Sequence, residues 1–66
     1  MNSQAHLQIR ERIEGHGPKH EIEYLCLDGI TIEHFTNEIY EEIMQVPNVE
    51  FLTLNHCHIQ SFENFP

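Results

Sequence analysis

Two stretches of this chain carry apolar side chains at the same spacing, 27 residues apart. The first stretch runs from Ile22 to Phe35 and the second from Val49 to Phe62. Each has six framework positions, and the same offsets recur in both: Ile22, Leu25, Leu27, Ile30, Ile32 and Phe35, then Val49, Leu52, Leu54, Cys57, Ile59 and Phe62. Such a recurrence predicts two similar units stacked side by side, because neither unit buries its apolar face alone. The alternative is a pair of unrelated amphipathic strands.

The spacing matches the leucine-rich repeat, L-x-x-L-x-L-x-x-N/C-x-L, whose period is roughly 20–29 residues. Leu52 and Leu54 then mark a short strand with both side chains on the core face. Ile59 and Phe62 are expected to fold back under the same core after a turn. Cys57 takes the position that asparagine usually holds, where a small side chain bonds to the backbone of the turn.

A helix is predicted at residues 3–14, before the first repeat. Ser3 is expected to cap it, and an apolar residue recurs at every fourth position from Ala5 to Ile13. Residues 15–18, which contain two glycines and a proline, are expected to end it. We interpret this helix as an N-terminal cap that covers the edge of the first strand and the end of the core.

A second helix is predicted between Phe35 and Pro47, because the apolar period there changes from two residues to about four. Phe35, Ile39 and Ile43 share one side of this helix. Thr36 is the expected N-cap and Pro47 the expected end. A helix in this place is the connector that a repeat of 27 residues needs.

These elements predict an α/β fold, a leucine-rich-repeat solenoid fragment with a cap helix, two strand–helix repeats and short parallel strands. The 66 residues form one domain, in which residues 22–48 are repeat 1 and residues 49–66 are a truncated repeat 2. Solenoid repeats bury their faces against neighbours, and about three are needed for stability. We therefore expect either the first part of a longer array or a homo-oligomer that covers the open C-terminal repeat.

The candidate binding site is the concave face of the sheet, onto which the side chains between the core leucines project. Six residues are predicted to form it: Tyr24, Cys26, Asp28, Phe51, Thr53 and Asn55. At their common offset they make an aromatic row, a row of small side chains and a polar row. Aromatic side chains carry much of the energy at protein interfaces, so this face predicts protein binding. Alternatively, the two aromatic residues only pack against each other across the strands.

The charge is strongly acidic and unevenly distributed. The formal net charge is −8, and the three basic side chains, Arg10, Arg12 and Lys19, all precede residue 20. From His20 onward there are nine carboxylates and no lysine or arginine. Such a surface repels nucleic acid and anionic membranes and attracts basic proteins. The alternative is that acidity only keeps a small protein soluble. Arg10 and Arg12 are expected to belong to a solvated helix face.

The sequence offers weak candidates for a metal site and none for catalysis. The sharpest metal motif is His56-Cys57-His58, but in an extended chain Cys57 turns inward while both histidines turn outward. Zinc requires three or four convergent ligands. No serine or cysteine nucleophile with a placed base and no glycine-rich phosphate loop is found. We predict a protein that is not an enzyme and has no cofactor or metal; a metal-dependent protein that uses these three residues is the alternative.

Two features suggest an intracellular protein. The chain has neither a run of about 18 apolar residues nor a signal-peptide pattern at its start. Cys26 and Cys57 occupy different positions of the repeat, so their side chains are not expected to form a disulfide. A reducing compartment is therefore the expected location.

Residues 5–12 and 22–28 carry a likeness to a known family. They resemble the N-terminal cap helix and first strand of the acidic leucine-rich nuclear phosphoprotein family. The likeness lies in Leu7, Arg10 and Arg12 of the helix, Leu25, Leu27 and Asp28 of the strand, and Phe65 and Pro66 at the end of the second repeat. The linker with Gly15, Gly17 and Pro18 is longer than in the family, and the later repeats, C-terminal cap and acidic tail are not in these 66 residues.

The resemblance implies a nuclear and cytoplasmic, non-enzymatic module whose concave face and acidic tail bind basic proteins, histones among them. Some members of that family inhibit a serine/threonine protein phosphatase or regulate transcription and cell death, and the resemblance implies these activities as further expectations. The alternative within the fold rests on residues 47–49 and Cys57, which look like the cysteine-containing repeats of substrate-recruiting ubiquitin-ligase subunits. A self-associating structural repeat protein is the other alternative.

Overall fold

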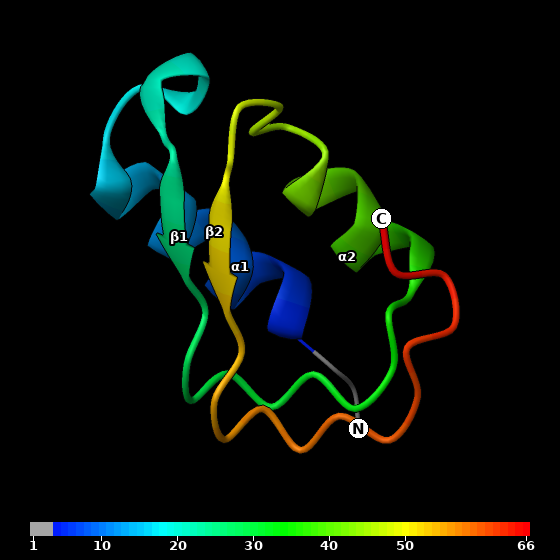
Figure 1. The fold of residues 1–66 in the computed structure, drawn as a ribbon. Coiled ribbons are helices and arrows are strands. Elements are labelled where there is room, and N and C mark those ends of the chain that lie inside the picture. Colours follow the sequence, from blue (N-terminus) through cyan, green and yellow to red (C-terminus); the bar gives the residue numbers. More distant parts are fainter. Residues whose placement is uncertain (1–3) are drawn as a thin grey trace.

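The computed structural model describes residues 4–66 and shows a small mixed α/β fold (Figure 1). Along the chain, the elements are helix α1 (Ala5–His16), the 3-10 turn η1 (Lys19–Glu21), strand β1 (Tyr24–Cys26), helix α2 (Asn37–Ile43) and strand β2 (Phe51–Thr53). The two strands form one parallel sheet, and α1 packs against β1 and against α2. The expected order of a first helix and two strand units is therefore confirmed.

The two strands are paired at the spacing that the sequence predicts. Leu25 lies opposite Leu52 in the parallel register. Backbone hydrogen bonds continue the pairing after the strands, from Gly29 N to Asn55 O at 2.9 Å and from Gln60 N to Glu33 O at 2.9 Å. In Figure 1 the green and orange segments accordingly run side by side below the sheet. The second stretch thus lies along the first over most of its length.

The first helix buries the predicted stripe. Ala5, Ile9 and Ile13 are 3%, 0% and 1% exposed. The predicted boundaries of residues 3–14 are partly wrong, because the helix runs from Ala5 to His16 and Gly17, with a φ of 115°, ends it. The predicted Ser3 cap lies outside the described residues.

The second helix begins where it was predicted to begin. The Thr36 hydroxyl accepts a hydrogen bond from Ile39 N at 3.3 Å, which satisfies one of the free N–H groups of the first turn. Ile39 is buried and faces the core. The helix ends at Ile43, before the predicted stop at Pro47, because Met44 already closes the last turn as its C-cap.

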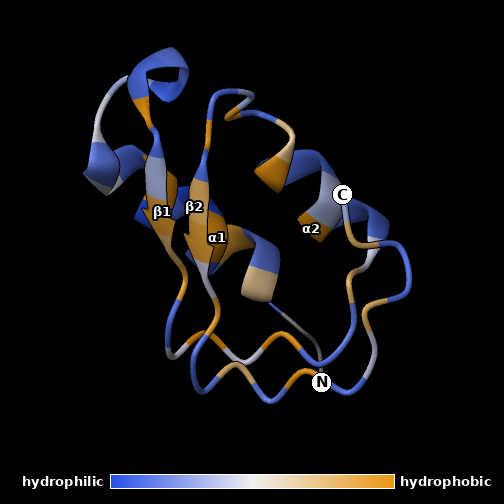
Figure 2. Cartoon of the chain, viewed as in Figure 1, coloured by the Kyte–Doolittle hydropathy of each residue, from blue (hydrophilic) through white to orange (hydrophobic). Residues whose placement is uncertain are grey.

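The first stretch is more deeply buried than the second. Leu25 and Leu27 are fully buried, whereas Leu52 and Leu54 are only half-buried against the same core. Figure 2 shows the apolar residues of both strands in front of the apolar side of α1. The first stretch lies between α1 and the second stretch, but no further strand covers the second stretch within residues 4–66.

The expectation that Phe62 folds under the core is wrong. Its side chain is 60% exposed. The ring stacks on Phe35, with the ring centroids 5.8 Å apart, and Phe65 packs edge-on against both rings. The physical reason is that the rings of Phe35 and Phe65, which pack against Phe62, leave most of its side chain open to solvent.

None of the helices described in the structure is long and apolar enough to cross a membrane.

Two glycines offer a test of the backbone assignments. Gly29 has a φ of 85°, and Gly15 lies within α1; a Cβ at either position meets no atom within 4 Å. Gly29→Ala is therefore expected to destabilise the fold by about 1 kcal/mol through backbone strain alone. Gly15→Ala is expected to stabilise it by roughly 0.5–1 kcal/mol, because alanine favours the helix. Urea unfolding monitored by circular dichroism measures the change in the free energy of unfolding for each variant. Changes of the same sign in the two variants would contradict the backbone conformations described for Gly29 and Gly15.

Candidate protein-binding face

The six predicted site residues share the outward face of the sheet. We call this surface the outer sheet face, formed by Tyr24, Cys26, Asp28, Phe51, Thr53 and Asn55. The register pairs Tyr24 with Phe51 and Cys26 with Thr53, so the first two predicted rows are confirmed. The alternation of a strand sends Leu25 into the core and its neighbours outward.

The aromatic row is largely open to solvent. Tyr24 is 54% exposed and Phe51 is 64% exposed. Packing across the strands therefore leaves more than half of each side chain uncovered. Exposed aromatic side chains held on a rigid strand pair lose little conformational entropy when a partner covers them, which suits them to binding.

The polar row is joined by hydrogen bonds. Asn55 N donates to Asp28 Oδ1 at 2.8 Å, and Asn55 Nδ2 donates to Asp28 Oδ2 at 3.3 Å. The backbone N–H of Asn55 lowers the pKa of Asp28 below its usual range, because the hydrogen bond favours the charged carboxylate. The third predicted row therefore pairs Asn55 with the ionised carboxylate of Asp28, and the hydrogen bonds from Asn55 in the second stretch fix the position of that carboxylate.

The middle row consists of two small, half-buried side chains. Cys26 is a free thiol. Thr53 Oγ1 is buried and has no hydrogen-bond partner among the residues described. The row separates the aromatic end of the outer sheet face from the acidic end, and it contributes no charge of its own.

Cys57 lies behind this face, in the turn after β2. Its side chain is 1% exposed. The thiol donates to Leu27 O at 3.2 Å and thus reaches across to the first stretch. Burial raises the pKa of the Cys57 thiol. The prediction of a small, buried side chain that bonds to the backbone of its turn is confirmed, because the thiol also contacts Asn55 O at 3.7 Å.

The histidines beside Cys57 point away from it. His56 and His58 are exposed and have positive φ angles of 62° and 54°. The predicted inward cysteine and outward histidines are thus confirmed. No group of three His, Cys, Asp or Glu side chains within residues 4–66 is placed to hold a metal ion.

The three basic side chains hydrogen-bond to other segments of the fold, and their positions in the sequence did not indicate these contacts. Arg10 Nε donates to Glu42 Oε2 at 3.0 Å and joins α1 to α2. This ion pair raises the pKa of Arg10. Lys19 Nζ donates to Gln45 Oε1 at 3.2 Å. Arg12 is half-buried and bonds to the backbone of the first stretch, so the expectation of a solvated face is wrong for Arg12, whereas Arg10 is exposed as expected.

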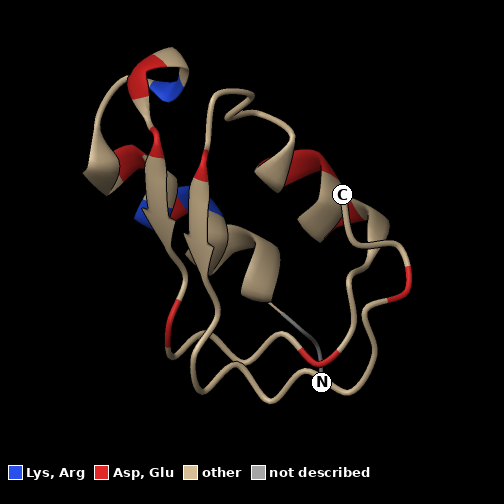
Figure 3. Ribbon diagram, in the orientation of Figure 1, with Lys and Arg blue, Asp and Glu red and all other residues tan. Residues whose placement is uncertain are grey.

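The acidic side chains are far less engaged. Arg10–Glu42 is the one ion pair within the described part of the chain. Figure 3 shows acidic positions along both stretches and α2, while the basic positions gather on α1 and η1. Ten of the eleven acidic side chains therefore form no ion pair with lysine or arginine in residues 4–66.

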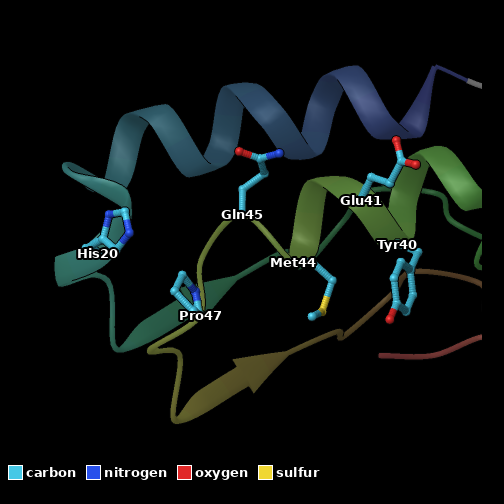
Figure 4. A pocket seen from close by; sticks show the side chains of 6 residues that line it. All are labelled: His20, Tyr40, Glu41, Met44, Gln45 and Pro47. Atoms are coloured by element: carbon cyan, nitrogen blue, oxygen red, sulfur yellow. The ribbon is translucent and has the colours of Figure 1, made fainter.

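A surface hollow of about 470 Å³ lies beside α2 and contains six side chains: His20, Tyr40, Glu41, Met44, Gln45 and Pro47. Figure 4 shows His20 and Glu41 at opposite ends of this hollow. Its only two ionisable groups besides the tyrosine thus do not converge, and the hollow brings no base to a nucleophile.

Comparisons with known proteins give no match: no family model, no curated protein and no solved structure is significantly similar to the chain.

The lowered pKa of Asp28 predicts a specific response to acid. Its contribution to stability is complete above the ordinary aspartate pKa of about 4 and is lost as the pH falls through the lower pKa of the folded state. Asp28→Asn keeps an acceptor for Asn55 N but removes the charge. The stability difference between this variant and the wild type is expected to shrink below about pH 4. Urea unfolding midpoints of both proteins at several pH values measure this stability difference. A difference that does not change with pH would contradict the lowered pKa of Asp28.

The two thiols are expected to react at very different rates with a thiol reagent. Cys26 is half-buried, whereas Cys57 is buried and its raised pKa keeps it protonated. Labelling is expected in two phases, with the Cys57 phase roughly a hundredfold slower because it requires local opening. In the control Cys57→Ser the slow phase disappears. Loss of the fast phase in that variant would reverse the assignment.

Proposed function

We propose that this chain is a non-enzymatic, acidic protein-binding module that binds basic proteins through the outer sheet face. We further propose that its two similar stretches are consecutive leucine-rich repeats behind a cap helix. The resemblance to acidic leucine-rich nuclear phosphoproteins makes histones the expected class of partner.

Support for consecutive repeats comes from side chains that meet their counterparts 27 residues on. Asn55 bonds to Asp28, its counterpart in the first stretch. Phe62 stacks on Phe35. Asn64 Nδ2 donates to Asn37 Oδ1 at 3.2 Å and also to Phe35 O at 3.0 Å. Contacts between equivalent positions are what a stack of repeats produces, because each unit lies in the same orientation on the one before it.

The observation that carries the basic-partner proposal is the imbalance of available charge. The chain's net charge of −8 already includes its three cations, which lie on α1 and η1, and the outer sheet face itself carries the carboxylate of Asp28 and no cation. A positively charged partner gains from this field, whereas nucleic acid is repelled. The exposed aromatic row, on the same face as Asp28, adds apolar area and a surface for cation–π contacts with lysine or arginine.

The test measures, by titration calorimetry, the binding of a lysine- and arginine-rich histone-tail peptide. Phe51→Ala is expected to weaken binding by about tenfold, because a central aromatic contact at an interface is worth 1–2 kcal/mol. Added salt is expected to weaken binding further by screening.

Leu7→Ala is the matched control, since Leu7 is a partly exposed apolar residue on α1, outside the outer sheet face. It is expected to leave peptide affinity unchanged. Equal affinity of the Phe51→Ala variant and the wild type, or binding that does not respond to salt, would sink the proposal.

A further inference from the structure

The two edges of the sheet are not alike, and the edge at β1 is covered. Arg12 Nη1 donates to Cys26 O at 2.9 Å and to Asp28 O at 3.3 Å. The guanidinium therefore occupies two of the carbonyls that β1 presents to a new strand. Unpaired strand edges attract other chains, and a charged side chain placed on the edge prevents this.

The edge at β2 has no such cover. Phe51 N bonds to Glu23 O at 3.0 Å, and Thr53 O accepts from Leu27 N at 3.0 Å, so both groups face β1. Backbone groups of successive strand residues face opposite sides, and the N–H and C=O of Leu52 therefore face away from β1. No strand pairs with that side within residues 4–66. Figure 1 shows the right-hand side of β2 free of any other strand.

An apolar hollow of about 320 Å³ adjoins this open edge. Its lining includes Met44 of the α2 end, Leu52 of β2 and Phe65. Glu50 is the single charged residue among its lining residues. The hollow is thus a largely apolar area on a chain whose net charge is −8.

The low charge of this hollow and the difference between the two sheet edges together indicate which partner fits the hollow. A basic partner gains most where carboxylates gather, and this hollow has one. A second copy of the chain offers a matching, largely apolar hollow and an equally open β2 edge. Head-to-tail stacking of copies would need the β1 edge, which Arg12 covers. Only the arrangement in which the two β2 edges meet remains.

We propose that two copies of this chain form a symmetric dimer in which their β2 strands pair antiparallel. The two-fold axis passes beside Leu52, so that its N–H and C=O meet the C=O and N–H of Leu52 in the second copy. The sheet then has four strands, with both β1 strands outside, and the two apolar hollows close on each other. Such an interface uses the same patch twice and cannot grow into a fibre.

The dimer does not depend on binding of a basic partner, and salt separates the two proposals. Two copies that each carry −8 repel one another, so screening strengthens the dimer. The same salt weakens binding of a basic peptide. Failure of one proposal therefore leaves the other standing.

Sedimentation of the wild type over a range of concentrations tests the dimer, with circular dichroism recorded alongside. Met44→Glu is expected to raise the dissociation constant at least about tenfold, because it places a charge inside the closed hollow. Tyr24→Glu is the matched control: it adds the same charge at a side chain that is 54% exposed, against 53% for Met44, and lies at the covered edge. It is expected to change the dissociation constant by less than about threefold.

A chemically synthesised chain with an N-methyl group on the Leu52 nitrogen isolates the backbone pairing. This change removes one outward N–H and no hydrogen bond within the chain, so the monomer is expected to keep its fold while the dimer is lost. N-methylation at Tyr24, on the β1 edge, is expected to leave the dimer intact. A wild type that stays monomeric or unfolded at all concentrations, or a dimer that survives both Leu52 N-methylation and Met44→Glu, overturns the proposal.

Discussion

The alignment of the second stretch on the first is the constraint on which the rest of this fold depends. Strands of three residues contribute few hydrogen bonds of their own. Contacts beyond the strands hold the register, including the Asn55–Asp28 bonds, the Cys57 thiol on Leu27 O and the Asn64 amide on Phe35 O. A shift by one residue would lose all of these contacts and turn the core leucines outward. The outer sheet face therefore has its three rows because the whole stretch is aligned.

The first helix completes the other side of this arrangement in two ways. Its apolar stripe fills the core behind β1, and its Arg12 satisfies carbonyls at the edge of the sheet. The Arg10–Glu42 pair ties the same helix to α2. Because this pair is partly exposed, its main effect is on the orientation of the helices, and its contribution to stability is small. Helix α1 thus covers the β1 edge of the sheet, whereas the β2 edge is unpaired within residues 4–66.

Periodic features of the fold were predictable from the sequence, and features that depend on a particular neighbour were not. The offset between Leu25 and Leu52 and the stripe through Ile9 follow from spacing alone, because period determines which face a side chain occupies. The exposure of Phe62 depends on whether another unit covers it, which spacing does not encode. The contact of Arg12 with β1 depends on the reach of a long side chain across elements, and nothing in the local pattern indicates it. The six residues of the outer sheet face were placed correctly in rows, while their role in binding stays a prediction.

All three basic side chains hydrogen-bond to other segments of the fold, and this limits how the charge at the outer sheet face can be regulated. Lys19 is the single lysine, and its ammonium bonds to Gln45. Acetylation or methylation of lysine would therefore act on the packing of η1 and leave the charge at the outer sheet face almost unchanged. The enzymes that modify lysine would thus alter the contact between η1 and the residues just after α2, and the attraction of the outer sheet face for a cationic protein would stay nearly the same.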